Sequence, residues 1–156
     1  MLALACLSAS GTAVFAHNYD KGLAAYERGD FEEALQEWRP LAEQGNAEAQ
    51  HRLGYMYLIG EGVLEDDAEA ERWFRFAAER GDIRAQGNLG LKYKKGEGVP
   101  QNDVLAHMWL SIAAANGNAR HRINRDVVEV GTTPTDISEA QERTRICMAS
   151  GYSDCD

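Results

Sequence analysis

The feature that most constrains this chain is a repeat with a period of 36 residues. The segment QGNAEAQ at 44–50 returns as RGDIRAQ at 80–86 and, more weakly, as NGNAR at 116–120. The loop GEGV at 60–63 returns at 96–99 in the same register. A fixed period of this length is typical of helical solenoids, in which each repeat is one supersecondary unit that stacks on its neighbours. The sequence therefore predicts one stacked architecture along most of the chain.

Each repeat unit closes with a glycine that is followed by an asparagine or an aspartate. Glycine adopts the left-handed backbone that ends a helix without steric cost, and an Asn or Asp side chain caps the next helix. Joins of this kind force a sharp reversal between helices. The pattern therefore predicts helix-turn-helix units that are joined at 45–46, 81–82 and 117–118.

Glycines and large side chains also recur inside the expected helices. Gly54 and Gly90 each cost about 1 kcal/mol relative to alanine, so we expect close helix–helix approach to compensate at these positions. Large side chains are expected to fill the grooves between neighbouring units, because such groups bury the most apolar area. These side chains are Trp73, Phe74, Trp109 and Leu110.

Together these motifs resemble the Sel-one-like repeat family, a branch of the tetratricopeptide-repeat superfamily. The resemblance covers two full units, 46–81 and 82–117. A shorter first pair at 18–44 lacks the glycine loop and is similar to an ordinary tetratricopeptide unit with its short turn. The resemblance implies an all-α fold, a right-handed α–α superhelix (solenoid) of about three and a half helix-turn-helix repeats.

The repeat pattern decays after Gly117, which predicts a polar terminal cap in place of a full fourth repeat. A helix with a different apolar side is expected there, marked by Ile123, Val127, Val128 and Val130. A last capping helix is expected to begin at Thr135 or Asp136 and to close the solenoid. The repeat domain is therefore expected to span 17–150, followed by a tail at 151–156.

The first 16 residues carry no charged side chain, although the rest of the chain is rich in charge. Residues 1–16 are interpreted as a secretory signal segment, with a cleavage site after Val14-Phe15-Ala16. The basic residues that usually precede such a region are absent from the sequence. Two alternatives stay open: an apolar helix that packs on the solenoid, and a lipoprotein signal at Cys6. The preferred interpretation predicts a periplasmic or secreted protein.

Removal of that segment would leave two cysteines, Cys147 and Cys155, near the C-terminus. Export and an even number of cysteines favour a disulfide, and Gly151 between them allows the chain to turn back. Two free thiols on a frayed tail are the alternative. A zinc site or a redox pair is disfavoured, because the spacing is wrong and no histidine lies nearby.

Charge and hydropathy exclude several partners. The formal net charge is −9 and the pI is about 4.9, so nucleic-acid phosphates and anionic lipid surfaces would repel the chain. No stretch reaches the roughly 20 apolar residues of a membrane-spanning helix, so stable membrane insertion is not expected.

The sequence offers no pattern that predicts catalysis, a metal or a cofactor. The four histidines, at 17, 51, 107 and 121, do not pair at a metal-ligand spacing. The glycine loops lack the Gly-Lys-Ser/Thr of a phosphate-binding loop, and their glutamates would repel phosphate. No serine stands in a Gly-x-Ser-x-Gly context. We therefore expect a protein that is not an enzyme.

The resemblance implies a protein or peptide partner on the concave face of the solenoid. In tetratricopeptide proteins the first helix of each pair lines that face. The residues at the matching positions are Glu48, His51, Arg52, Tyr55, Arg84, Asn88 and Leu91. Two other functions stay open. One is an envelope-acting hydrolase or beta-lactam-binding enzyme, as in cysteine-rich relatives, although those carry paired cysteines in every repeat and this chain has none there. The other is a structural accessory of an envelope complex.

Overall fold

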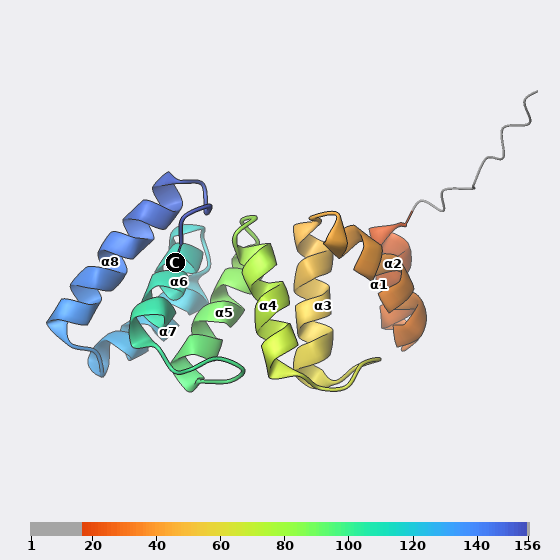
Figure 1. Cartoon of the computed structure of the whole chain (residues 1–156), viewed down its shortest axis with the longest axis horizontal. Helices are drawn as coiled ribbons and strands as arrows, with labels where there is room; N and C mark the ends of the chain where they lie inside the picture. Colours follow the sequence, from red (N-terminus) through yellow and green to blue (C-terminus); the bar gives the residue numbers. More distant parts are fainter. Residues whose placement is uncertain (1–16, 156) are drawn as a thin grey trace, which may run out of the picture.

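The computed structural model of the protein describes residues 17–155. Within this range the chain forms eight α-helices and stacks them into an elongated array (Figure 1). The expected signal segment and Cys6 lie outside the described residues. The helices are α1 (Tyr19–Glu27), α2 (Phe31–Glu43), α3 (Ala47–Ile59), α4 (Asp67–Ala78), α5 (Ile83–Lys95), α6 (Asp103–Ala115), α7 (Ala119–Val130) and α8 (Pro134–Ala149).

Consecutive helices form antiparallel pairs that stack along one axis. The helix α1 pairs with α2, α3 with α4, and α5 with α6, and each second helix also packs on the first helix of the next unit. The last helix, α8, packs on α6 (Figure 1). These contacts confirm an all-α repeat solenoid with a C-terminal capping helix.

The short turns between units have the predicted chemistry. Gly45 and Gly81 have positive φ angles of 92° and 84°. The next residues, Asn46 and Asp82, cap α3 and α5 by accepting a hydrogen bond from the backbone N–H three residues on, at 2.9 Å in both cases. The short turns lie along one edge of the solenoid and the longer glycine loops along the opposite edge (Figure 1).

The glycine loops pack against the unit that precedes them. A Cβ atom added to Gly62 would lie 2.6 Å from the Cβ atom of Phe31, at the start of α2. A Cβ atom on Gly98 would collide with the backbone of Asp67, at the start of α4. The second glycine of each loop is therefore required because the loop backbone touches the preceding second helix.

The helix-interior glycines allow the close approach that the sequence predicts. A Cβ atom on Gly54 would lie 2.7 Å from the ring of Phe74, and one on Gly90 would lie 2.8 Å from Cγ of Leu110. A real side chain at either position would push α3 from α4, or α5 from α6. The lost helix propensity is therefore offset by packing between paired helices.

The core forms two clusters along the solenoid axis. Trp38, Leu53 and Met56 belong to the N-terminal cluster, whereas Leu89 and Trp109 belong to the C-terminal one. Helix α4 contributes to both, since Trp73 packs into the first cluster and Phe74 into the second. This arrangement confirms the expectation that large side chains fill the grooves between neighbouring units.

The C-terminal end differs from the expected polar cap. Helix α7 buries His121 and Val128 but exposes Ile123 at 64%, Val127 at 61% and Val130 at 90%. Of the apolar side expected on this helix, only Val128 is therefore buried, and the other three residues stay exposed because no further helix packs on them within residues 17–155. Helix α8 begins at Pro134, one residue before the expected range, with Thr133 as its N-cap.

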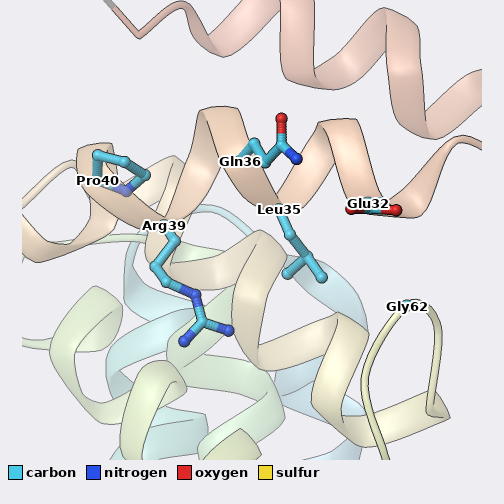
Figure 2. Close-up of a pocket in the computed structure, with 6 residues that line it drawn as sticks. All are labelled: Glu32, Leu35, Gln36, Arg39, Pro40 and Gly62. Atoms are coloured by element: carbon cyan, nitrogen blue, oxygen red, sulfur yellow. The ribbon is translucent and has the colours of Figure 1, made fainter.

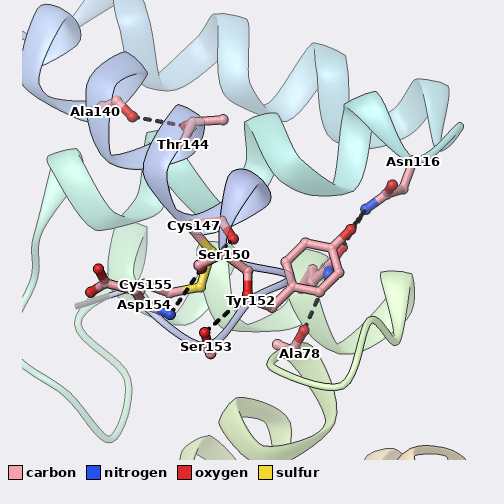
Figure 3. Close-up of a disulfide and its surroundings, with 11 residues drawn as sticks. Ala78, Asn116, Ala140, Thr144, Cys147, Ser150, Tyr152, Ser153, Asp154 and Cys155 are labelled. Atoms are coloured by element: carbon pink, nitrogen blue, oxygen red, sulfur yellow. Dashed lines mark hydrogen bonds between the residues drawn. A yellow bond between two sulfur atoms is a disulfide. The ribbon is translucent and has the colours of Figure 1, made fainter.

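The tail after residue 150 folds back onto the repeats and does not extend away from them (Figure 3). Cys147 in α8 and Cys155 in the tail are joined as a disulfide, and both are buried. The side chain of Tyr152 packs against the C-terminal core cluster. Tyr152 has a φ of 70° and is the only non-glycine residue with positive φ among residues 17–155.

Candidate interaction surface

The residues predicted to bind a partner lie on one side of α3 and α5. Their spacing of three, four and seven residues places them on one face of each helix. We call this surface the first-helix face. It consists of Glu48, His51, Arg52 and Tyr55 from α3, and Arg84, Asn88 and Leu91 from α5.

Side chains on the first-helix face contact one another from helix to helix. The Arg84 guanidinium lies 3.5 Å from the carboxylate of Glu48. Asn88 Nδ2 lies 3.3 Å from His51 Nε2. Arg52 Nε donates to the hydroxyl of Tyr19 in α1 at 3.0 Å. These contacts therefore involve five of the seven predicted residues. Two pairs join α3 to α5 and Arg52 joins α3 to α1, whereas Tyr55 and Leu91 take no part in them.

The predicted residues differ in how far a partner could reach them. Tyr55 is 39% exposed, and Glu48 and Arg84 are also exposed. His51 is only 8% exposed, and its ring packs against Phe74 with centroids 5.7 Å apart. Arg52, Asn88 and Leu91 are half-buried. Tyr55, Glu48 and Arg84 are therefore the side chains most accessible to a partner, whereas His51 is buried beneath this face.

Burial determines the charge of His51. Desolvation lowers its pKa to about 4, and the nearby Arg84 and Arg52 act in the same direction against the opposing charge of Asp82. His51 is therefore neutral at pH 7. The pKa of Arg84 is raised, first by its hydrogen bond to Asp82, so the fixed charges of this face come from arginines and carboxylates.

Two apolar residues extend the first-helix face onto α7 and were not among the predicted site residues. Ile123 and Val127 stand 36 residues after Gly87 and Leu91, so they occupy equivalent positions on the next first helix. Both are exposed. The repeat register alone could have identified them, but the decay of the motif after Gly117 hid that register.

A polar row between α6 and α7 has the connectivity of a hydrolase triad. Ser111 Oγ lies 3.3 Å from Nδ1 of His107, and Nε2 of His107 lies 2.7 Å from a carboxylate oxygen of Glu129. His107 is 2% exposed. Ser111 lies inside α6, where backbone N–H groups are used by the helix and cannot form an oxyanion hole. The geometry supplies no place for an acyl substrate.

The preceding repeat shows why this row exists. Glu71, Arg75 and Tyr93 stand 36 residues before His107, Ser111 and Glu129. Arg75 donates to Glu71 at 2.7 Å and also to the hydroxyl of Tyr93. Both rows tie a second helix to the first helix of the next unit. The serine, histidine and glutamate are therefore a divergent version of a repeated structural contact, and no sequence motif indicated it.

A pocket lies between α2 and the loop that joins α3 to α4 (Figure 2). Its volume is about 480 Å³, and its lining includes Leu35, Arg39, Pro40 and Gly62. Arg39 already donates to the hydroxyl of Tyr57 at 3.2 Å. This pocket combines apolar surface with one arginine and one glutamate at its rim, a lining that favours no particular ligand.

The described part of the chain contains no group of three or more His, Cys, Asp or Glu residues that could hold a metal ion. Among the same residues, no helix has the length and apolar character needed to cross a membrane.

Comparison with solved structures identifies the fold. A crystal structure of a Sel1 repeat protein from Oxalobacter formigenes is 36% identical, with a TM-score of 0.64, over 69% of this chain and 84% of that protein. A protective antigen present in uropathogenic Escherichia coli strains, described as displaying an SLR fold, is 28% identical with a TM-score of 0.80. That match covers 86% of this chain but 31% of the antigen.

Two curated proteins match a shorter part of the chain. Both are described as exopolysaccharide production negative regulators, one from Rhizobium leguminosarum bv. viciae and one from Rhizobium meliloti (strain 1021). They are 43% and 41% identical over 49 residues, which is 31% of this chain and only 18% of each relative.

The family model of the Sel1 repeat matches residues 47–82 and 83–118, each one residue later than the two full units predicted at 46–81 and 82–117. Sel1 repeat proteins are generally non-enzymatic scaffolds for protein–protein interaction. On the repeat match, the shared fold and the 36% identity with a solved Sel1 repeat protein, this chain belongs to the Sel1 repeat family.

Proposed function

We propose that this protein is a non-catalytic interaction module that binds a segment of a partner protein on its first-helix face. The observation that carries the proposal is the exposure of Tyr55, Glu48 and Arg84 on one side of α3 and α5, where Arg84 is held by Asp82 at 2.7 Å and lies 3.5 Å from Glu48. Preorganised side chains lose less conformational entropy when a partner binds. This surface also has the mixed aromatic and charged character that interaction hot spots favour.

The chemistry of the first-helix face constrains the partner segment. Tyr55 offers an aromatic ring, and Ile123 and Val127 offer exposed aliphatic surface at the C-terminal end. Arg84 and Glu48 offer one charge of each sign. A peptide or helix with apolar side chains at one end and both charges near the other end would complement this arrangement.

We also propose that the protein acts outside the cytoplasm. Two features support export: the uncharged residues 1–16 and the pair Cys147 and Cys155. Disulfides persist in oxidising compartments such as the periplasm. Intact-mass measurement of the protein from fractionated cells tests this proposal, since it reports both the mature N-terminus and the oxidation state. A protein that starts at Met1, or that carries two free thiols, would contradict it.

The binding proposal is tested by crosslinking in the native envelope followed by mass spectrometry. The double variant Tyr55→Ala with Arg84→Ala should lose the partner. A matched control, Met148→Ala with Arg145→Ala on α8, should retain it, because Met148 has the same 39% exposure as Tyr55. Equal recovery from both variants would exclude the first-helix face and would favour a structural accessory that binds through its outer surface.

The exopolysaccharide regulators suggest polysaccharide production as a process in which this protein could act. They support the binding proposal no more than membership of the family does. Their match covers 18% of each regulator, so their regulatory activity can reside outside the shared segment. The crosslinked partner, once identified, decides whether this protein acts on polysaccharide production.

A further inference from the structure

Two equivalent clefts lie along the edge of the solenoid that carries the short turns. The first cleft is formed by the end of α2, the start of α3 and the end of α4, and has a volume of about 290 Å³. It is lined by Ala42, Glu43, Gln50, Arg72, Trp73, Phe76 and Arg80. The second cleft is formed by the same elements one repeat later, at the ends of α4 and α6 and the start of α5.

The tail of the chain fills the second cleft. The ring of Tyr152 lies over Gly81, with Cε2 3.5 Å from the position of an added Cβ atom. Its hydroxyl accepts a hydrogen bond from Asn116 Nδ2 at 2.9 Å, and the same nitrogen donates to Gln86 Oε1 at 3.2 Å. The disulfide between Cys147 and Cys155 closes the loop that presents this ring.

The first cleft has the same frame, but the exposed side chain of Arg80, and not the tail, lies over its turn glycine, with Nε 3.3 Å from the position of a Cβ atom on Gly45. Gln50 Nε2 donates to Ala42 O at 2.9 Å, as Gln86 Nε2 donates to Ala78 O at 3.2 Å. Gln50 Oε1, however, has no hydrogen-bond partner in the described chain, although Gln50 is only 2% exposed. Buried polar atoms without partners are rare because they lose their hydration and gain nothing in return.

A second residue of the same cleft has an unpartnered atom. Trp73 Nε1 is buried and also has no acceptor within the described residues. One unsatisfied acceptor and one unsatisfied donor therefore belong to two residues that line a single cleft. A hydroxyl group can donate to the first atom and accept from the second, and a phenol also brings a ring that can pack against Trp73 and Phe76.

The rim of the first cleft carries two arginines, Arg72 and Arg80, and one glutamate, Glu43. The guanidinium of Arg72 lies 5.1 Å from the centre of the Trp73 ring and already pairs with Glu69 at 2.8 Å. Arg80 stands at the repeat position of Asn116, and the second cleft has no arginine at either position. Because Arg72 is paired, Arg80 is the charge that an acidic residue beside an incoming aromatic ring would meet.

We infer that the first cleft is a binding site for a tyrosine side chain presented by a partner peptide with flanking acidic residues. Tyr152 is the internal precedent, since it fills the equivalent cleft and is followed closely by Asp154. The first cleft lies at the turn edge and shares no residue with the first-helix face. This site can therefore exist whether or not the first-helix face binds a partner.

The probe is a synthetic peptide with the sequence of residues 147–156, closed by its disulfide. It is titrated into the ¹⁵N-labelled protein, and the indole N–H resonance of Trp73, assigned with Trp73→Phe, reports on the first cleft. We expect this resonance to shift. A peptide with phenylalanine at the tyrosine position should bind about fivefold more weakly, because it cannot make the hydroxyl's hydrogen bonds.

Charge reversal at the rim supplies the second measurement. Arg72→Glu with Arg80→Glu should weaken binding by roughly tenfold or more, whereas Arg122→Glu with Arg145→Glu, an equal change in net charge elsewhere, should leave it within about twofold. If the reversed variant does not fold by circular dichroism, Arg80→Ala replaces it, with a smaller loss of affinity expected.

Three results would overturn the inference. The first is an unchanged Trp73 resonance at millimolar peptide. The second is equal affinity for the tyrosine and phenylalanine peptides. The third is concentration-dependent self-association of the protein that Tyr152→Phe abolishes, which would make a second copy the occupant.

Discussion

The two full repeats have the same helices, turns and glycine loops, yet their clefts at the turn edge differ. The first cleft is open, whereas the second is filled by the tail of the chain. In the second repeat Gln86, Asn116 and Tyr152 form a closed hydrogen-bonded set. In the first repeat the equivalent Gln50 keeps an unpartnered oxygen, and Arg80 replaces the asparagine. The repeat motif therefore determines the frame of each cleft, and residues outside the motif determine whether the cleft is filled.

The comparison also extends to the first-helix face. His51 packs against Phe74 in the first repeat, whereas the equivalent Gly87 is covered by the ring of His121 from α7. A histidine ring fills this space in both repeats, but the two rings come from different helices. His51 belongs to the first repeat itself, whereas His121 reaches the second repeat from α7.

The largest expected difference between the two repeats concerns their equivalent tryptophans. Trp109→Ala should reduce the free energy of unfolding by about 4 kcal/mol, because Trp109 is completely buried in the closed repeat. Trp73→Ala should cost at least about 1 kcal/mol less, since water can enter the open cleft and relieve the cavity. Urea denaturation of both variants measures this difference. Equal losses would mean that the first cleft is as closed as the second.

Loss of the disulfide should have the second largest effect, and it should act on the second repeat. Cys147→Ser with Cys155→Ser should lower the free energy of unfolding by roughly 2–3 kcal/mol, because the unfolded chain gains the freedom of the short loop. Thermal unfolding with and without reductant provides the measurement. The wild-type protein in reductant should match the double variant, and a variant with unchanged stability would show that the loop does not need its covalent closure.

Acid should affect the first repeat through His51. The unfolded chain binds a proton there near pH 6.5, whereas burial lowers the folded pKa to about 4. The stability is therefore complete above pH 6.5 and falls as the pH decreases towards 4, by roughly 2 kcal/mol at pH 5. His51→Leu should remove this part of the difference between urea midpoints at pH 7 and pH 5. An unchanged pH dependence in that variant would assign the effect to other groups.

The smallest expected effect isolates the hydroxyl of Tyr152. Tyr152→Phe should lower the free energy of unfolding by about 1 kcal/mol, since Asn116 keeps its bond to Gln86 and only one hydrogen bond is lost. Arg80→Ala, at the position of Asn116 in the first repeat, should change stability by less than about 0.5 kcal/mol because its side chain is exposed. Equal effects in urea denaturation would remove the contrast between the clefts.

The sequence was sufficient for the features that depend on local chemistry. The Gly45 and Gly81 turns, the Asn46 and Asp82 caps and the close approach at Gly54 all follow from backbone conformation and short-range hydrogen bonding, and the structure confirms each of them. The 36-residue period then specified how often these units recur, because identical units stack in the same way.

The candidate site was only partly predictable. The period placed Glu48, Tyr55 and Arg84 on one face, and the structure exposes all three and pairs Glu48 with Arg84. It could not indicate that His51 is buried beneath them, since burial depends on where the Phe74 ring of another helix lies. Exposure of Ile123 and Val127 was missed for a similar reason: an apolar residue is covered only if another element packs on it.

The sequence by itself determined a Sel1 repeat solenoid, its unit boundaries and its tight turns, because these are local and periodic. Only the tertiary structure decided that Tyr152 occupies the second cleft, that Gln50 and Trp73 border an open one, and that His107 links Ser111 to Glu129. Tyr152 lies outside the repeats, and the side chains at 107, 111 and 129 differ in type from those at the equivalent positions 71, 75 and 93. These contacts depend on the path of the chain in space, which the repeat pattern does not encode.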